Sequence, residues 1–200
     1  MESVPATDTA LVERLQTGDE SALAGLMTRH QGPLFYFVRR YLSNETIARE
    51  IVQETFVRAY FHVNSYHPTS SFKTWLYQIA VNLCRDHSRR VSRRPILASL
   101  YELLKPGSAQ TLDSVLSDSG LNPAENMEAA EKHALVESAI AELPKEMREA
   151  LLLFAFEEFS QKECAEVLGI SPKAVELRVY RAKKELQLKL QRFLNKDGLF

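Results

Sequence analysis

"AEVLGISPKAVELRVYRAKKEL", residues 165–186, is the stretch that decides the fold of the C-terminal part of the chain. It holds a short apolar segment, a break at Gly169, and a longer segment rich in Lys and Arg. Just upstream, Ser160 and Glu163 have the spacing of a capping box, which predicts a helix that begins after the serine. Glycine readily adopts the left-handed conformation that ends a helix, so this first helix should end before Gly169.

A second helix should follow directly. Ser171 can cap it, and Pro172 suits its first position, where no backbone N–H is missed. Two helices joined by a short turn with a glycine form a helix-turn-helix. Four apolar residues fall on one stripe of the second helix, at intervals of four, three and four: Val175, Val179, Ala182 and Leu186.

The opposite face of this second helix mixes basic and bulky side chains. Arg and Lys can reach phosphates or guanine edges, Glu can accept from cytosine, and an outward Leu or Tyr can contact a thymine methyl. The pattern favours a DNA-reading helix, and an ordinary helical hairpin with a solvated basic face is the alternative. The face comprises Lys173, Leu177, Tyr180, Arg181 and Lys184, with Glu176 and Arg178 on its flanks.

Charge is strongly partitioned along the 200 residues, although the formal net charge is only −1. Residues 72–94 hold six Lys/Arg against one Asp/Glu, giving +5, and residues 171–196 hold eight against two, giving +6. Residues 128–166 hold four against ten, giving −6. Two basic islands on an otherwise acidic chain are expected of a protein that touches a polyanion in two places. The alternative is a set of solvated helix faces.

The basic island before the linker also carries aromatic residues. Rings stack on any base and Arg neutralises the backbone, so this mixture suits unpaired bases. The preceding polar loop, 64–71, could receive a base pulled from its stack. The alternative is that Trp75, Ile79 and Leu83, spaced by four, belong to the core. The island contains Phe72, Trp75, Tyr77, Asn82, Arg85, Arg89 and Arg90.

Helical periodicity dominates the whole chain, and no alternating strand pattern bounded by turns is found. We therefore predict an all-α fold of two small helical domains joined by a flexible linker, the C-terminal domain being a helix-turn-helix. The predicted domains are 1–94 and 128–200, and the linker is the Pro-, Gly- and Ser-containing segment 95–127. The predicted helices are 8–16, 20–42 with a break or kink near Gly32-Pro33, 45–63, 72–93, 124–142, 145–157, 160–168 and 172–194.

The predicted helix 45–63 has a core side and a free side. Glu50, Glu54 and Arg58 lie off its apolar face, which leaves them free for a partner. The apolar face comprises Ile47, Ile51, Val52, Phe56, Ala59, Tyr60 and Val63.

Several functional classes find no support in the sequence. No apolar run approaches the roughly 20 residues that cross a bilayer, and the N-terminus has neither a basic start nor an apolar segment of a signal peptide, so we expect a cytoplasmic protein without membrane insertion. Cys84 and Cys164 belong to no metal-spaced cluster. Phosphate-loop, nucleophile-elbow and zinc-protease motifs are missing from the sequence, so we expect no metal, no cofactor, no catalytic residue and no enzymatic activity.

The chain resembles bacterial RNA polymerase sigma factors of the extracytoplasmic-function (ECF) group within the sigma-70 family. The resemblance rests on segments in the family's order, with a divergent linker between them, and covers most of the chain. Taken together they are specific, whereas the helix-turn-helix by itself is not. The segments are "DESALAGLMTRHQGPLFYFVRRYL" (19–42), "EIVQETFVRAY" (50–60), "FKTWLYQIAVNLCRDHSRR" (72–90), "ELPKEMREALLLFAFEEFSQKECAEVLGIS" (142–171) and "AVELRVYRAKKEL" (174–186).

The resemblance implies three interfaces. A helix equivalent to 50–60 docks on the coiled coil of the largest clamp subunit of core RNA polymerase, which assigns polymerase binding to Glu50, Gln53 and Glu54. The next loop and helix recognise and melt the minus-ten promoter element on the non-template strand. That role would fall to Asn64, Ser65, Phe72, Trp75, Tyr77, Asn82, Arg85, Arg89 and Arg90.

The third implied interface is with duplex DNA. The family's C-terminal helix-turn-helix reads the minus-thirty-five element, here through Lys173, Glu176, Leu177, Arg178, Tyr180, Arg181 and Lys184. Family members are commonly held inactive by an anti-sigma protein, which makes such a protein a further candidate partner.

Two departures from the family pattern concern the polymerase-binding helix. Ile47 and Arg49 stand where many relatives carry acidic residues, which leaves Glu50 as the acid of that cluster, and Tyr60 stands where relatives carry Trp. The first departure implies a weaker or assisted contact with polymerase. The alternative function is a two-domain helix-turn-helix regulator that binds duplex DNA without being a polymerase subunit.

Overall fold

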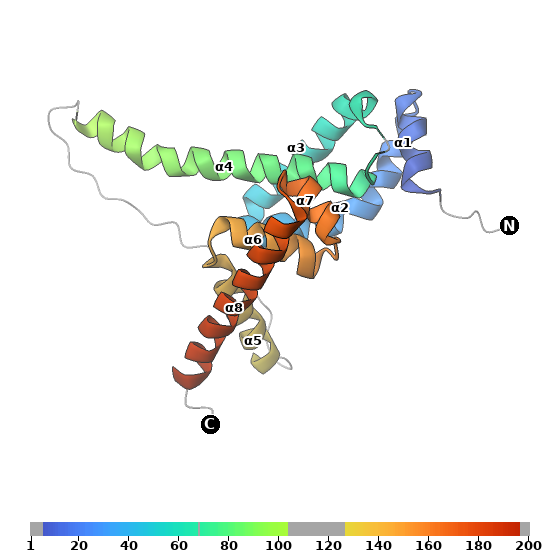
Figure 1. Ribbon diagram of the computed structural model, residues 1–200. Coiled ribbons are helices and arrows are strands. Elements are labelled where there is room, and N and C mark those ends of the chain that lie inside the picture. The colour runs from blue at the N-terminus through green and yellow to red at the C-terminus, as the bar shows by residue number, and fades with distance from the viewer. Residues whose placement is uncertain (1–5, 68, 104–126, 197–200) are drawn as a thin grey trace.

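The computed structural model describes the backbone of residues 6–67, 69–103 and 127–196, and the side chains of 6–67, 69–93 and 134–191. Every regular element in these ranges is helical (Figure 1), so the predicted all-α class is confirmed for the described part of the chain. The helices form two groups. We call α1 to α4 the N-terminal unit and α5 to α8 the C-terminal unit.

The N-terminal unit is a bundle in which side-chain caps start two of the helices. Thr7 Oγ1 accepts from the Ala10 amide at 3.3 Å, and Asn44 Oδ1 accepts from the Ile47 amide at 2.9 Å. Each such bond satisfies one of the N–H groups that a helix start leaves without a partner. The elements are α1 (Asp8–Gln16), α2 (Ser21–Leu42), α3 (Glu45–His62), the short 3-10 helix η1 (Val63–Ser65) and α4 (Phe72–Leu103).

The C-terminal unit contains the predicted helix-turn-helix. Its capping box is confirmed: the Ser160 amide donates to the Glu163 carboxylate at 2.9 Å, and the Glu163 amide donates to Ser160 Oγ at 3.2 Å. Gly169 ends the helix with a φ of +69°, the left-handed conformation that glycine adopts at low cost. The elements are α5 (Met127–Ala141), α6 (Lys145–Leu151), the π-helical η2 (Leu152–Phe156), α7 (Gln161–Leu168) and α8 (Pro172–Lys196).

Two proline-containing segments differ from the predictions. The sequence predicts a break or kink near Gly32-Pro33; the break is wrong, because α2 runs through Pro33 without interruption. The helix α4 continues through Pro95 to Leu103, so residues 95–103 of the predicted linker are helical. An interior proline costs about 3 kcal/mol or more, because it removes one N–H donor and its ring clashes with the preceding turn. The Leu, Ala and Glu residues that follow Pro95 favour helix and offset part of this cost. Residues 104–126 of the predicted linker lie outside the described residues.

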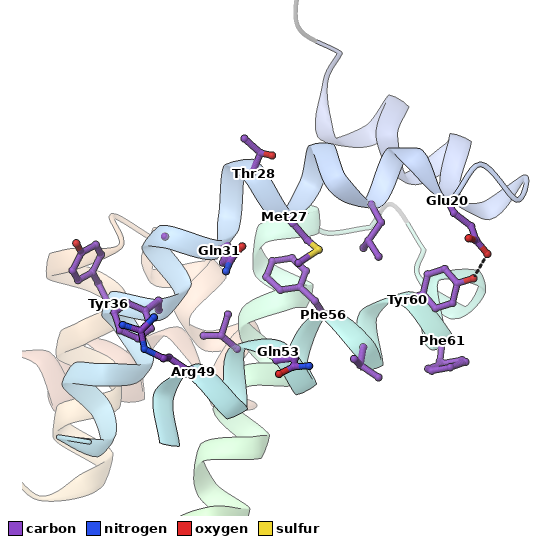
Figure 2. Close-up of a pocket in the computed structure, with 15 residues that line it drawn as sticks. Glu20, Met27, Thr28, Gln31, Tyr36, Arg49, Gln53, Phe56, Tyr60 and Phe61 are labelled. Atoms are coloured by element: carbon purple, nitrogen blue, oxygen red, sulfur yellow. Dashed lines mark hydrogen bonds between the residues drawn. The ribbon is translucent and has the colours of Figure 1, made fainter. Parts of the chain in front are cut away.

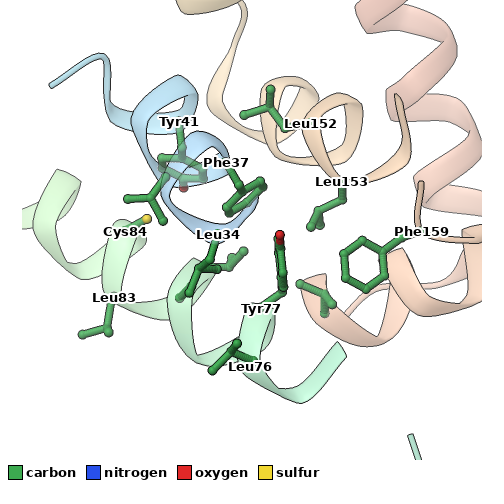
Figure 3. Close-up of a cluster of buried hydrophobic side chains, with 14 of the residues drawn as sticks. Leu34, Phe37, Tyr41, Leu76, Tyr77, Leu83, Cys84, Leu152, Leu153 and Phe159 are labelled. Atoms are coloured by element: carbon green, nitrogen blue, oxygen red, sulfur yellow. The ribbon is translucent and has the colours of Figure 1, made fainter. Parts of the chain in front are cut away.

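The two units share one apolar core (Figure 3). Phe37 of α2 and Tyr77 of α4 meet Leu152 and Leu153 of η2 and Phe159, which precedes α7. The Tyr77 ring centroid lies 5.2 Å from that of Phe37 and 5.0 Å from that of Phe159. Full burial of each such side chain contributes about 1.5–3 kcal/mol, so this contact holds the units together.

Helix contacts agree with this shared core. The helix α4 lies against α7, and α2 lies against α5 and η2 (Figure 1). Within the C-terminal unit α5 packs on α8, where Lys189 pairs with Glu142 at 2.6 Å. None of the helices in the described ranges combines the length and apolar character needed to cross a bilayer.

Candidate nucleic-acid and partner interfaces

The buried stripe of α8 is as predicted. Val175 and Ala182 have no exposed surface, Val179 is buried, and Leu186 packs on the edge of the core. This stripe anchors α8 on the C-terminal unit, so its opposite face is held toward solvent. A rigid helix with one anchored side is what reading a DNA groove requires.

The exposed face of α8 carries the residues predicted for duplex DNA. Tyr180 is 64% exposed and Leu177 is 46% exposed, which is unusual for apolar side chains on an anchored helix. Lys173 pairs with Glu176 at 2.8 Å, and the half-buried Arg178 pairs with Glu146 of α6 at 3.2 Å. The remaining members of the set, Arg181 and Lys184, are exposed on the same helix.

The loop before α4 presents polar residues over an aromatic cluster. Asn64 and Ser65 are exposed, as base capture requires. Phe72 is buried beneath them, with Tyr66 at 6.2 Å and Trp75 at 5.9 Å between ring centroids. Phe72 therefore belongs to the core of the N-terminal unit, while Trp75 is half-buried and serves both the core and the surface.

The predicted minus-ten residues on α4 separate into two groups. Asn82, Arg89 and Arg90 are exposed along the basic side of the helix. Tyr77 is fully buried between the two units, and its hydroxyl donates to the Glu157 carboxylate. In this arrangement Tyr77 is a core residue and does not face solvent. Burial and the neighbouring Glu157 carboxylate raise its pKa well above the usual range.

Arg85 is the basic residue of α4 that the C-terminal unit engages. Its Nη2 lies 2.7 Å and its Nε 3.1 Å from the two oxygens of Glu149, which is 1% exposed. This is the two-bond geometry in which guanidinium and carboxylate pair most strongly. Hydrogen bonding to Glu149 raises the pKa of Arg85, so the guanidinium stays charged in the pair.

The predicted polymerase-binding residues on α3 all face solvent. Glu50, Gln53 and Glu54 are exposed, and Glu54 pairs with Arg58 one turn later at 2.7 Å. The core side of α3 is also as predicted, with Ile51, Val52, Phe56, Ala59 and Val63 buried.

An apolar groove beside these residues was missed by the sequence reasoning. It lies between α2 and α3, has a volume of about 1140 Å³, and includes Gln53 in its wall (Figure 2). Phe61 is 73% exposed and Tyr36 is 53% exposed at its rim. The four-residue spacing of Gln53, Val57 and Phe61 was the signal, because it marks a second stripe along α3 next to the buried one.

Reactive or metal-binding groups are not gathered at these surfaces. Among the described residues no group of three or more His, Cys, Asp and Glu side chains could hold a metal ion. Both cysteines are buried thiols, and burial raises the pKa of Cys164 to about 12 and that of Cys84 higher still. Raised thiol pKa values make these side chains poor nucleophiles.

An anchored helix-turn-helix, a separate aromatic and basic surface, and an apolar groove with an acidic edge define a class of protein. Such a protein contacts nucleic acid at two places and docks on a protein partner. The family models agree with this class: the Sigma-70 region 2 model matches residues 26–94, and the Sigma-70 region 4 model matches residues 133–186.

Relatives extend the match to nearly the whole chain. The chain is 33% identical to the ECF RNA polymerase sigma-E factor of Haemophilus influenzae, over 92% of this chain and 96% of the relative. It is 31% identical to the RNA polymerase sigma-H factor of Pseudomonas aeruginosa, over 94% and 95% of the two chains. The chain belongs to the ECF group of RNA polymerase sigma factors.

Solved structures share the fold. CnrH, solved in complex with the cytosolic domain of CnrY, superposes with a TM-score of 0.67 at 29% identity, over 92% of this chain and 97% of that one. The sigma factor RpoE of Bartonella quintana, solved with the anti-sigma factor NepR, gives a TM-score of 0.63 at 22% identity, over 82% and 94%.

Proposed function

We propose that this sigma factor directs core RNA polymerase to promoters through three separate surfaces. The exposed side of α3 and the adjoining groove bind polymerase. The loop 64–71 and the basic side of α4 capture the minus-ten element as a single strand. The outer face of α8 reads the minus-thirty-five element as duplex.

The contrast between the two faces of α8 is the strongest support for this proposal. Its inner stripe is buried in the C-terminal unit, while Leu177, Tyr180 and Arg181 stand exposed together on the outer face. Single exposed apolar residues are common on protein surfaces, but Leu177 and Tyr180 lie one helical turn apart and directly beside the cation Arg181. Apolar contact with thymine methyls and paired contact with guanine give them a use in the major groove.

The polymerase contact is supported by the groove between α2 and α3. A coiled coil presents apolar and charged side chains along a helix, and the groove offers an apolar floor with Gln53 in its wall. Glu50 and Glu54 are exposed on the same helix and supply negative charge, and the groove lining itself carries both Glu20 and Arg49. This mixture favours an amphipathic protein helix with charged flanks as the occupant.

The promoter geometry requires the two units to separate. Elements about 25 base pairs apart lie roughly 85 Å apart along duplex DNA at 3.4 Å per base pair. In the described arrangement α4 and α7 are packed against each other. We therefore propose that this closed arrangement opens before both elements are read.

The remaining properties follow from the same proposal. The protein supplies binding free energy and no catalysis of its own, and it acts in the cytoplasm, where its polymerase resides. CnrH was solved with the cytosolic domain of CnrY and the Bartonella RpoE with the anti-sigma factor NepR, and an anti-sigma protein is accordingly a candidate partner here. Polymerase dependence distinguishes this function from that of a two-domain regulator.

Run-off transcription tests the proposal directly. Purified core polymerase is incubated with a promoter library, with and without the purified chain. We expect discrete new transcripts that share upstream sequence elements only when the chain is present. Duplex binding without any polymerase-dependent transcript would favour the two-domain regulator.

A further inference from the structure

The last residue of α1 is bound to the start of the minus-ten loop. The side-chain amide of Gln16 donates from Nε2 to the carbonyl of Val63 at 2.8 Å and to the carbonyl of Tyr66 at 3.3 Å. The Val63 carbonyl also accepts from the Tyr66 amide at 3.1 Å, so the Gln16 amide adds a second bond there and ties the end of η1 to α1. Gln16 lies outside residues 26–94, the segment that the Sigma-70 region 2 model matches.

The other end of the same turn is fixed by Tyr66. Its ring packs on Trp75 at 5.2 Å between centroids, and its hydroxyl donates to the carbonyl of Ser70 at 2.7 Å. The backbone path from Val63 to Ser70 therefore has an anchor at each end. Between the anchors Asn64 and Ser65 are exposed.

We propose that Gln16 is a positioning residue for capture of the minus-ten bases. It holds the Val63 and Tyr66 carbonyls in one geometry, and so sets the direction in which Asn64 and Ser65 meet an unstacked base. This inference rests on the proposed function of the loop. An amide N–H is what the site needs, because a carboxylate has no donor and would face two carbonyl oxygens.

The test compares Gln16→Glu and Gln16→Met with Glu13→Gln, a change at an exposed position of the same helix. The probe is the non-template strand of a promoter selected in the run-off experiment, with each minus-ten base changed in turn. We expect both Gln16 variants to lose about tenfold in affinity and most of their discrimination between bases. Binding to the duplex upstream element and to polymerase should stay at the wild-type level.

Two results would overturn the role of Gln16. The first is unchanged base discrimination in both variants; the second is an equal loss at all three interfaces together with a lower melting temperature, which marks a general folding defect. Failure of the wild-type chain to direct polymerase would instead contradict the proposed function itself.

A second and independent observation concerns the interface between the two units. Its carboxylates all come from the C-terminal unit and most of its donors from the N-terminal unit, the exception being Arg148, which donates to the Tyr41 carbonyl at 3.0 Å. Glu149 accepts from Arg85 and from the Tyr41 hydroxyl, and both Glu149 and Glu157 are buried. The other contacts are Tyr77 with Glu157, Lys73 with the Glu157 carbonyl at 2.7 Å, and Arg40 with Glu137 at 2.7 Å.

We infer that Glu149 is an intramolecular competitor of promoter DNA. It occupies the guanidinium of Arg85, which is the group predicted to neutralise a phosphate of the minus-ten strand, and it does so in the closed arrangement that cannot span both elements. Opening exchanges a carboxylate for a phosphate on the same two donors. The free chain therefore restrains itself without a second protein.

Neutralising each of the two buried carboxylates should shift the equilibrium between the closed and open forms, in opposite directions. Glu149 faces a full guanidinium charge, so Glu149→Gln removes an ion pair and should favour opening. Glu157 accepts mainly from a neutral hydroxyl, and burial raises its pKa, so its charge opposes closing. An amide oxygen in Glu157→Gln can still accept from Tyr77, and this variant should favour the closed form.

Energy transfer between dyes measures the opening. Cysteines placed at the exposed positions Glu13 and Gln187 carry the dyes, since the two native thiols are buried. We expect Glu149→Gln to lower the closed-to-open ratio by about tenfold or more and to raise affinity for the minus-ten strand correspondingly. Glu157→Gln should shift the ratio the other way, and Glu185→Gln, at a half-buried carboxylate of α8, should leave it unchanged.

A second variant guards against a folding defect in Glu149→Gln. Tyr41→Phe removes a neutral hydrogen bond to the same carboxylate and should favour opening by a smaller factor. The inference is wrong if Glu149→Gln and Tyr41→Phe both leave energy transfer unchanged, or if Glu149→Gln opens the chain without any gain in strand affinity.

Discussion

The two promoter-reading surfaces are built in different ways. The face of α8 is complete within the C-terminal unit: a capped helix, a glycine turn and a buried stripe hold it in place. The proposed minus-ten surface of the N-terminal unit is shared, since Arg85 pairs with Glu149 of the other unit. A rigid preformed face suits duplex DNA, whereas we propose that single-strand capture requires Arg85 to be released first.

The largest effect should come from the core that joins the two surfaces. Leu153 is fully buried in η2, and Leu153→Ala should lower the free energy of unfolding by about 2–5 kcal/mol. Chemical denaturation measures this loss. Leu188→Ala, at a half-exposed position of α8, is the control and should cost far less. Equal losses would show that the shared core contributes little to stability.

The next largest effect is expected at the surface proposed to read duplex DNA. Arg181→Ala should weaken binding to the minus-thirty-five duplex by about 1–3 kcal/mol and relax its sequence preference, if the side chain reads a base edge. Binding assays on selected and scrambled duplexes measure both quantities. Capture of the minus-ten strand and of polymerase should be unchanged, and a loss of polymerase binding would contradict the assignment of α8.

A change on the proposed polymerase surface should affect polymerase binding and leave both DNA surfaces intact. Glu54→Lys reverses an exposed charge beside the groove and should reduce affinity for core polymerase about tenfold, which corresponds to about 1.4 kcal/mol. Co-purification or fluorescence anisotropy with core polymerase measures it. Glu166→Lys on α7 makes the same charge change elsewhere. If both variants bind polymerase equally, α3 is not the docking helix.

The contribution of the capping box to the stability of the helix-turn-helix can be measured at Ser160. Ser160→Ala removes the bond to the Glu163 amide and should destabilise the protein by about 1 kcal/mol. Ser160→Asn keeps a capping side chain and should recover most of this loss. Thermal unfolding measures the difference. If alanine costs nothing, the start of α7 is held by packing alone.

The smallest effect should be a pH dependence from Glu157. Burial raises its pKa above the usual 4.5, so the folded chain holds this proton more tightly than the unfolded chain. Its contribution to stability is fully present below 4.5 and is lost as pH rises through the raised pKa. The groups that face it are Tyr77 and Lys73 of α4 and Arg40 of α2.

Denaturation at several pH values, with wild type compared with Glu157→Gln, isolates this contribution. As pH rises, the free energy of unfolding of the wild type should fall relative to that of Glu157→Gln, and the difference should then level off. A constant difference would mean that the carboxyl group has the same proton affinity in both states.

Local signals explain why much of the fold could be predicted. The capping box at Ser160, the stop at Gly169 and the stripe through Val175 each depend on residues a few positions apart, and all three are found in the structure. The exposure of Glu50 and Glu54 followed from the same periodicity. Proline is a weaker signal in this chain, because Pro33 and Pro95 both lie within continuous helices.

The partner of a surface could not be predicted from periodicity. Tyr77 lies on a stripe of α4 that another helix covers, but nothing local to α4 indicates that this helix comes from residues beyond 127. For the same reason the sequence predicts Arg85 as a minus-ten residue and does not indicate its pairing with Glu149. The α2–α3 groove requires two helices to be placed side by side, which a single helical stripe does not specify.

The pairing of Arg85 with Glu149 has a consequence for ionic strength. A cation that neutralises a phosphate normally releases a counterion, and each such release adds about 0.7 to the log–log salt slope for single strands. When Arg85 moves to DNA, a condensed cation leaves the phosphate as it does for any arginine, but the Glu149 carboxylate loses its partner and attracts a salt cation in exchange. The closed chain should therefore bind the separated strand with a shallower salt slope than its exposed arginines would give, and Glu149→Gln should restore the steeper one.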